Sequence, residues 1–380
     1  LNFRNGNKDK REYALMVGGM GLEAAAEGPF RKGSPASYLV NYRYSTVSLM
    51  AGFLDLGGIA PSYQDLSFKL NFPTQKAGTF SVFGLGGLNK AVKKPTKDST
   101  KWDDDNPNFV LDAPGKMGVA GLIHQIFLNQ QSYLKTILSV SGRHASSVFD
   151  TLNPAAAYQS VNIGKEKDID IAYRASIMYN NKFSSRSTLR AGLNVSRLSF
   201  DYNNAYYDDV DDEWEQRLAA EGKSMYYQGY IQWKYMLTRS LTLNTGIHGS
   251  LFGLNNTKSI EPRLALTYKA VANQTFSLAV GLHAKPDHLS TYYFAQKDAN
   301  DIPVTPNRDL EMTKALHFVL GYDKTFPGNI RLKTELYYQH LYDVPVEKKA
   351  GSYFSMLNSS GFYDLAEIGA LVNEGKGKNY

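Results

Sequence analysis

Apolar and polar positions alternate along most of this chain. The stretch RSLTLNTGIHGSLF, residues 239–252, shows the pattern clearly. One set of alternate positions is mostly apolar and the other mostly polar: Leu241, Leu243, Thr245, Ile247, Gly249 and Leu251 against Thr242, Asn244, Gly246, His248 and Ser250. Successive side chains of a strand point to opposite faces, so the pattern predicts a β-strand with one apolar and one polar face.

The same alternation recurs along the whole sequence and predicts about fourteen or fifteen strands. The expected connections alternate in length. Short turns are expected near residues 74, 130, 184, 238, 272 and 327, and longer loops near 55, 100, 155, 210, 298 and 358. The link near residue 256 is short where a long one is due.

Some segments lack a clear alternation of apolar and polar positions. Residues 11–26 are expected to form one first strand. Residues 145–166 and 201–223 are expected to be long polar loops, and EWEQRLAAEG within the second could form a short helix. Residues 286–311 and 345–372 are expected to complete the set of long loops.

Composition narrows the class. The chain has 380 residues, of which 26 are Tyr, 19 are Phe and 32 are Gly, and it shows no helix-period segment of useful length. Aromatic and β-branched residues favour strands, which makes the chain all-β. No composition break suggests a linker, so residues 1–380 are treated as one domain.

The charge and the cysteine content argue against several functional classes of protein. Lys and Arg are scattered and the net charge is only +6, which argues against a nucleic-acid partner. The absence of cysteine excludes disulfides and Cys-ligated metal sites.

The loop pattern favours a membrane barrel. No run reaches the ~18 apolar residues of a membrane helix, so contact with lipid would require a closed barrel. Short turns on one rim and long loops on the other are typical of outer-membrane barrels, whereas a soluble sandwich usually lacks one-sided loop lengths. The expected fold is a transmembrane antiparallel β-barrel, present in part, with long extracellular loops and short periplasmic turns.

The polar strand faces are expected to line the lumen of that barrel. They carry charges of both signs that could pair across strands. The expected lumen-lining residues are Asn244, His248, Glu261, Arg263, Arg331, Lys333 and Glu335. Leu, Val, Ile and Phe on the other face should meet lipid, with Tyr and Trp toward the strand ends.

Two acidic, aromatic stretches are candidates for ligand capture, WDDD at 102–105 and YYDDVDDEW at 206–214. Aromatic faces could stack on ring-bearing ligands while carboxylates bind hydroxyls. The candidates are Trp102, Asp103, Asp104, Tyr206, Tyr207, Asp208, Asp211 and Trp214. The run lacks the spacing of an EF-hand, so a solvated acidic loop is preferred; weak Ca²⁺ binding is left open at Asp208, Asp209, Asp211 and Asp212.

No catalytic or cofactor motif stands out. The seven His are dispersed without metal-ligand spacing, and His248, His283 and His317 are expected to line the lumen. GLGG at 84–87 and GGMG at 18–21 lie within strand patterns and are interpreted as strand glycines. The chain is therefore not expected to be an enzyme or to bind a cofactor.

Six stretches resemble the barrel of TonB-dependent outer-membrane receptors of the Bacteroidetes group. They occur in matching order along the chain and belong to the barrel wall: EGPFRKGSPASYLVNYRYSTVSLM, QDLSFKLNFPTQKAGTFSVFGLGG, SIEPRLALTYK, KALHFVLGYDKTF, LKTELYYQHLYDVPV and LVNEGKGKNY. The resemblance implies a barrel of about 22 strands in the bacterial outer membrane, with a plug domain and the last strands lying outside this chain.

The resemblance also implies energised import of a scarce nutrient. An inner-membrane TonB complex would act through the plug, and the outer wall would contact lipid and lipopolysaccharide. A surface lipoprotein over the loops is left open as a partner. The alternatives are a passive porin-like channel and a surface-binding or adhesive barrel; a secreted solenoid or sandwich is disfavoured.

Overall fold

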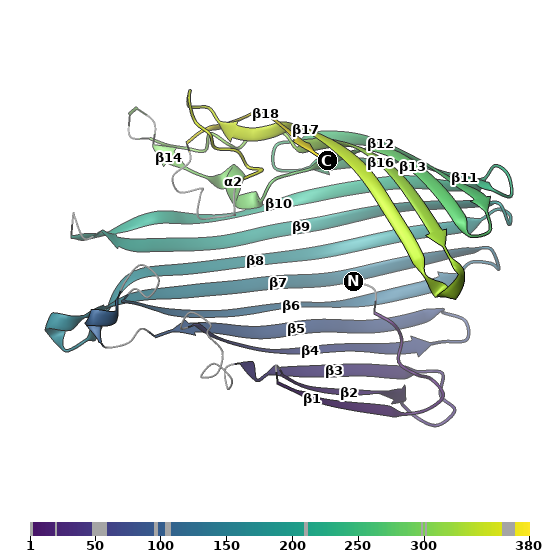
Figure 1. Cartoon of the computed structure of the whole chain (residues 1–380), viewed down its shortest axis with the longest axis horizontal. Helices are drawn as coiled ribbons and strands as arrows, with labels where there is room; N and C mark the ends of the chain where they lie inside the picture. The colour runs from purple at the N-terminus through teal and green to yellow at the C-terminus, as the bar shows by residue number, and fades with distance from the viewer. Residues whose placement is uncertain are drawn as a thin grey trace. The chain divides into compact units, whose positions relative to one another are not determined.

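The computed structural model describes residues 3–19, 21–47, 59–94, 98–102, 108–208, 212–297, 299–300, 302–358 and 369–380. Over these residues the chain is almost entirely strand (Figure 1). The strands are β1 (Glu12–Gly18), β2 (Gly21–Pro29), β3 (Ser37–Ser45), β4 (Ile59–Pro73), β5 (Thr79–Lys93), β6 (Phe109–Phe127), β7 (Ser132–Asn153), β8 (Gln159–Lys182), β9 (Ser187–Asp208), β10 (Glu213–Met236), β11 (Leu241–Phe252), β12 (Thr257–Val271), β13 (Gln274–Lys285), β14 (Gln296–Lys297), β15 (Pro303–Val304), β16 (Thr313–Thr325), β17 (Arg331–Glu347) and β18 (Leu371–Asn379).

Helices are few and short. They are α2 (Leu289–Tyr293) and the 3₁₀ turns η1 (Ser99–Lys101), η2 (Pro154–Ala156) and η3 (Pro327–Asn329). No helix in the described ranges has the length and apolar character needed to cross a bilayer.

Sixteen described strands form one sheet whose neighbours follow chain order, with β13 pairing directly to β16. The neighbouring strands pair in antiparallel fashion, for example β4 with β5, β10 with β11, β11 with β12 and β13 with β16, as expected for strands joined by hairpins. The small β14–β15 hairpin lies apart from this order, within the connection from β13 to β16. The all-β, antiparallel prediction is confirmed.

The predicted turns agree closely with the observed ones. Tight connections occur at 74–78, 128–131, 183–186, 237–240, 272–273 and 326–330, and the link at 253–256 is short. Long connections join β3 to β4, β5 to β6, β13 to β16 and β17 to β18.

Three predictions about segments were wrong. Residues 11–26 form most of a hairpin of two strands, β1 and β2, rather than one strand, which raises the strand count to sixteen. Residues 145–166 and 201–223 are mostly the ends of β7 to β10 rather than long loops. EWEQRLAAEG belongs to β10 and is not helical.

The chain divides into two compact units. The first comprises residues 1–125, 137–173 and 199–221, and the second residues 126–136, 174–198 and 222–380. In the first unit the N-terminal segment crosses the polar face of β2 to β5: Arg4 pairs with Glu27 at 2.5 Å, Lys69 Nζ donates to the carbonyl of Phe3, and Phe3 lies against Phe83.

Candidate functional site

The polar residues predicted on β11 and β12 share one face of the second unit. In the register of these strands His248 lies opposite Glu261, Gly246 opposite Arg263, and Asn244 opposite Ala265. Residues opposite one another in an antiparallel pair project to the same face. The structure therefore brings Asn244, His248, Glu261 and Arg263 together, as the alternation predicted.

Glu261 is the centre of this polar group, and its side chain is only 1% exposed. One carboxylate oxygen accepts a hydrogen bond from Ser259 Oγ at 2.7 Å and lies 2.9 Å from His248 Nδ1. The other accepts from the Arg263 guanidinium at 2.7 Å. Three partners compensate for the removal of this charge from water.

The hydrogen bonds continue on both sides of Glu261. Gln228 Nε2 lies 3.4 Å from His248 Nε2, an arrangement that fits an imidazole protonated on Nδ1 and accepting on Nε2. Ser250 Oγ lies 2.7 Å from Ser259 Oγ and 3.5 Å from Met312 Sδ. The network thus reaches from β10 to the residue before β16.

A groove of about 410 Å³ lies beside this network, from β10 to β16, and shares His248 and Arg263 with it. Small residues form its base, namely Gly246, Ala265, Ala279 and Gly281. Its polar border includes His248, Arg263, His283 and His317, and the last two rings lie 4.5 Å apart. One guanidinium and three imidazoles suit a ligand that carries hydrogen-bond acceptors or negative charge.

The remaining predicted lumen residues lie on β17, nearer the short turn at η3. Arg331 forms an ion pair with Asp323, and Lys333 forms one with Glu335 at 2.7 Å. Their side chains are 51–63% exposed for Arg331, Lys333 and Glu335, so these pairs contribute little to stability. The register places Glu335 opposite Gly321, whereas His317 is opposite Gln339. The structure does not bring this group next to Glu261.

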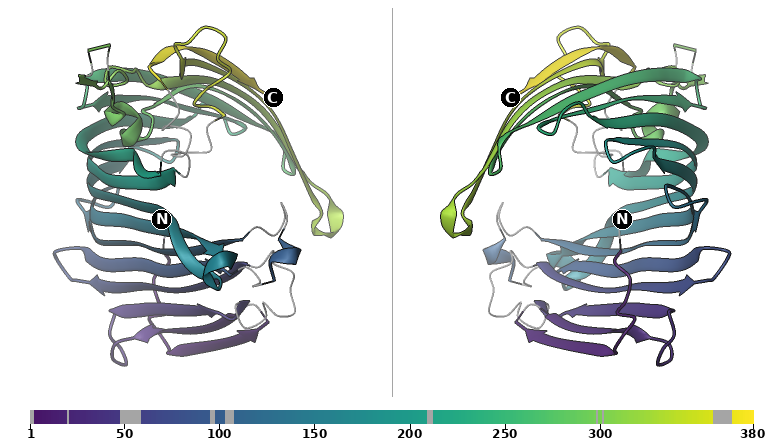
Figure 2. Two further views of the ribbon diagram at one scale, coloured as in Figure 1. Left: turned by 90° about the vertical axis from the view of Figure 1, so that its left-hand side faces the viewer. Right: turned by 90° about the vertical axis from the view of Figure 1, so that its right-hand side faces the viewer.

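A folded connection covers the polar face at the long-loop ends of β11 to β13 (Figures 1 and 2). We call the described residues of this connection, 286–297, 299–300 and 302–312, the cap. Tyr292 of α2 is fully buried with its ring 4.9 Å from that of Phe252, which is on the same face as His248 and Ser250. Leu289, Phe294, Leu310 and Met312 are also buried. The sequence analysis expected only a long loop here.

Hydrogen bonds fasten the cap to its surroundings. Asn255 Nδ2 donates to the carbonyls of Arg308 and Leu310 at 3.1 and 2.7 Å. Asn307 Oδ1 accepts from the backbone N–H of Leu371 at 2.8 Å. Tyr293 Oη donates to the carbonyl of Lys223 at 3.0 Å. The cap is thus attached to β10, to the β11–β12 link and to β18.

One carboxyl group in the cap is poorly solvated. Asp287 Oδ2 is buried without a hydrogen-bond partner among the described residues. Burial raises the pKa of Asp287 to about 6, although the nearby Lys285 opposes the shift. The charge of this group therefore changes near neutral pH.

The aromatic and acidic candidates lie in the first unit. Tyr206 and Tyr207 belong to β9 and Trp214 to β10, so they occupy strand ends and not a loop. Tyr207 and Trp214 are 6.0 Å apart, Lys165 lies 5.4 Å over the Trp214 ring, and Tyr206 hydrogen-bonds to Glu166. Trp102 contacts Tyr158 edge-on at 6.0 Å.

Several of these candidates lie outside the described residues, namely Asp103, Asp104, Asp209 and Asp211. Asp208 ends β9, and Asp212 accepts a hydrogen bond from Tyr207. Within the described part of the chain no group of three or more His, Cys, Asp or Glu could hold a metal ion. Weak Ca²⁺ binding at this acidic run stays a prediction.

Comparison with known proteins identifies the fold. No protein-family model and no curated protein sequence matches the chain. Among solved structures, the pyoverdine outer membrane receptor FpvA of Pseudomonas aeruginosa PAO1 is 14% identical with a TM-score of 0.67, and the match covers 99% of this chain and 58% of FpvA. The fold is that of a TonB-dependent receptor barrel.

Two further structures support this fold. The ferric-catecholate import receptor Fiu of E. coli K12 is 10% identical with a TM-score of 0.66; the match covers 98% of this chain and 62% of Fiu. The RagAB peptide transporter is 11% identical with a TM-score of 0.60, with 94% and 47% covered. This chain therefore spans about half to three fifths of each of these chains.

Proposed function

We propose that this chain is barrel wall of a TonB-dependent transporter that imports a scarce nutrient across the bacterial outer membrane. The observation that supports this proposal most strongly is that the two faces of the sheet in the second unit differ in polarity. The polar face bears a hydrogen-bonded groove and the cap, whereas the other face bears exposed aliphatic side chains such as Ile247 and Ile260, which are 49% and 70% exposed. Lipid would cover the exposed apolar side chains of one face, and water would solvate the polar groups of the other.

In this proposal the long-loop ends face the cell exterior. The cap and the Tyr206–Trp214 cluster would then contact incoming ligand, and the groove beside His248 and Arg263 would line the path. The full set of capture residues includes Trp102, Asp103, Asp104, Tyr206, Tyr207, Asp208, Asp211 and Trp214, as predicted from the sequence. The lumen set includes Arg331, Lys333 and Glu335 together with the Glu261 group.

The partners follow from the same proposal. An inner-membrane TonB complex would drive import through a plug domain, lipid and lipopolysaccharide would surround the wall, and a surface lipoprotein remains a further partner. No nucleic-acid partner is proposed. The similarity to the Bacteroidetes group also stays a prediction from the sequence.

The proposal leaves the chemical class of the ligand to be determined. The similar structures are described as taking pyoverdine, ferric catecholates, peptides or copper. Ligands rich in oxygen acceptors or negative charge fit the Arg263 and histidine border of the groove best. A panel of siderophores, peptides, sugars and vitamins covers these possibilities.

The test is growth and uptake in a strain that lacks the gene of the full-length protein. We expect slow growth on one limiting nutrient of the panel, and loss of its uptake when TonB is deleted or the proton gradient is collapsed. Re-expression of the full-length protein should restore uptake only in energised cells. Uptake that continues in de-energised cells would favour the passive channel, and unchanged uptake with lost surface adhesion would favour the adhesive barrel.

A further inference from the structure

A second groove lies on the apolar face of the first unit. It crosses β3 to β8 and offers about 1000 Å³. Glycine faces it from three successive strands, at Gly86, Gly118 and Gly142. Gly86 is paired directly with Gly118, and Gly86 also pairs with Leu66. A row without side chains therefore crosses the wall.

The floor of this groove is open at two of its three glycines. A Cβ added at Gly86 would have no atom closer than 3.7 Å, and one at Gly142 none closer than 3.4 Å, whereas one at Gly118 would lie 3.3 Å from the carbonyl oxygen of Leu85. Gly84 differs, because the ring of Phe68 already occupies the place of its Cβ. Exposed apolar side chains border the open floor, including Leu66, Leu88, Val140 and Ile171.

Cationic and polar groups stand at one end of this floor. Lys116 lies two residues before Gly118, and His144 two residues after Gly142, so both project to the same face as the glycines. Gln64 pairs with Leu88, and Leu88 pairs with Lys116, so these three residues form one row across β4, β5 and β6. Gln64 accepts a hydrogen bond from Tyr42. This end is toward the long connections of β3–β4 and β5–β6.

The other charged lining residues do not compete for Lys116. Asp65 and Asp170 are on the opposite face and pair with Arg43 and Arg143 at 3.0 and 2.8 Å. Lys116 is exposed and forms no ion pair with an acidic residue in the described part of the chain. The groove thus presents an unneutralised ammonium at the end of an apolar floor.

The position of Lys116 matches the edge of a bilayer. At the short-turn end the apolar band ends at Phe72, Phe80 and His124, with the last two rings stacked at 4.4 Å. Gln64 and Phe72 are eight positions apart on β4, a strand path of roughly 27 Å. Strands of such barrels tilt by about 35–45°, so this path spans roughly 20 Å of an apolar band about 25 Å tall. Lys116 therefore lies near the outer edge of the band, where its long side chain can reach the headgroups.

We propose that this groove binds one phosphorylated, multi-acyl glycolipid of the outer leaflet. Acyl chains would lie on Gly86, Gly118 and Gly142, and a phosphate would pair with Lys116 beside His144 and Gln64. Apolar burial holds the chains, and an interfacial lysine contributes about 1 kcal/mol to an anionic headgroup. The inference rests on the outer-membrane location in the proposed function and not on import.

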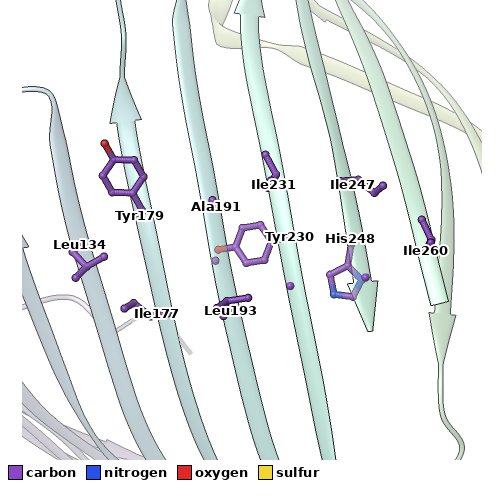
Figure 3. Close-up of a pocket in the computed structure, with 13 residues that line it drawn as sticks. Leu134, Ile177, Tyr179, Ala191, Leu193, Tyr230, Ile231, Ile247, His248 and Ile260 are labelled. Atoms are coloured by element: carbon purple, nitrogen blue, oxygen red, sulfur yellow. The ribbon is translucent and has the colours of Figure 1, made fainter. Parts of the chain in front are cut away.

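The chain offers a matched control in its second unit. Gly229 and Gly249 are paired and form the floor of another apolar notch, bordered by Leu193, Ile231, Ile247 and Ile260 (Figure 3). No Lys or Arg lines this notch. It should take lipid chains without preference for a phosphate.

The test is native mass spectrometry of the full-length protein extracted from outer membranes, with bisphosphorylated lipid A as the probe. Dephosphorylated lipid A and phosphatidylglycerol serve as comparison probes. We expect Lys116→Gln to weaken lipid A binding about five- to tenfold and Lys116→Arg to restore it. Gly118→Leu should reduce retention of both lipid A forms, and Gly249→Leu should leave lipid A binding unchanged.

Other outcomes overturn the proposal. Equal retention of lipid A by wild type and Lys116→Gln, or equal binding of phosphatidylglycerol, would show that the groove only takes bulk lipid. Heat-modified gel mobility confirms that each variant is folded, and the exposed Lys116 variants keep the test valid if Gly118→Leu misfolds. Selective lipid A binding by a protein without energised uptake would refute the proposed function and leave this inference standing.

Discussion

The wall and the cap of the second unit bury apolar side chains in different ways. On the wall, Ile260 and Leu336 are 70% and 67% exposed, although both belong to regular strands. In the cap, Tyr292 and Met312 have no exposed surface at all. The wall leaves its apolar face exposed, which lipid would cover in the proposed function, whereas the cap has its own core. The two regions should therefore respond differently to the same kind of substitution.

The largest effect is expected in the cap core. Tyr292→Ala removes a fully buried ring from Phe252 and should destabilise the cap by about 3–5 kcal/mol. Hydrogen exchange at residues 286–312 should become fast while β11 and β12 stay protected. Ile260→Ala, on the lipid-facing wall, is the contrasting variant and should leave the cap protected.

The second largest loss of stability is expected when the buried carboxylate of Glu261 is removed. Glu261→Leu leaves His248, Ser259 and Arg263 without their common acceptor, which should cost about 2–4 kcal/mol in a urea unfolding assay. Glu335→Leu removes a glutamate from the same face that forms an ion pair with the exposed Lys333. It should cost about 0–1 kcal/mol. Similar costs for both glutamates would show that Glu261 is not a structural centre.

A charge on the apolar face of β11 tests the wall itself. Leu243→Arg should destabilise the barrel by roughly 2–4 kcal/mol if the residue is near the bilayer midplane, because the guanidinium would meet hydrocarbon. Asn244→Arg, one residue along the strand, should be tolerated because that side chain projects to the polar face. Folding yield into lipid vesicles measures both, and equal yields would contradict the face assignment.

The smallest effect should be a pH dependence of the cap. The pKa of Asp287 is raised to about 6 by burial, so between about pH 4 and 6 the folded cap holds a proton that the unfolded cap has lost. Cap stability should therefore fall as pH rises through this range and level off above it. Asp287→Asn should remove that slope, which hydrogen exchange at residues 289–294 between pH 4 and 8 would reveal.

The wall was predictable from sequence because lipid and water impose a strict period on it. Leu243 and Asn244 were assigned to opposite faces by alternation alone. His248 and Glu261 were each placed on the polar face of a strand in the same way, and the register brings them opposite one another. The outer part of the β9–β10 hairpin was missed because both of its faces carry polar residues, as in Tyr206–Asp208, and the alternation disappears. The end of β1 at Gly18 was missed because it falls within GGMG, whose residues resemble continued strand.

The cap could not be predicted because its core is assembled from distant positions. Phe252, Tyr292, Met312 and Leu371 come from separate segments, and each looks unremarkable in its local sequence. Asn307 and Asn255 act as anchors only after the chain has folded back. The glutamate at the centre of the polar group was predicted, but its partner Ser259 was not, since a serine in a strand carries no distinctive signal.

The most direct test of the two-faced wall uses the absence of native cysteine. Single-cysteine variants Leu243→Cys and Asn244→Cys of the full-length protein would each carry an environment-sensitive fluorophore in vesicles of brominated lipid. The account predicts strong quenching at position 243 and weak quenching at position 244. Equal quenching at both positions, or stronger quenching at 244, would contradict the assignment of the apolar face to lipid and the polar face to the transport path.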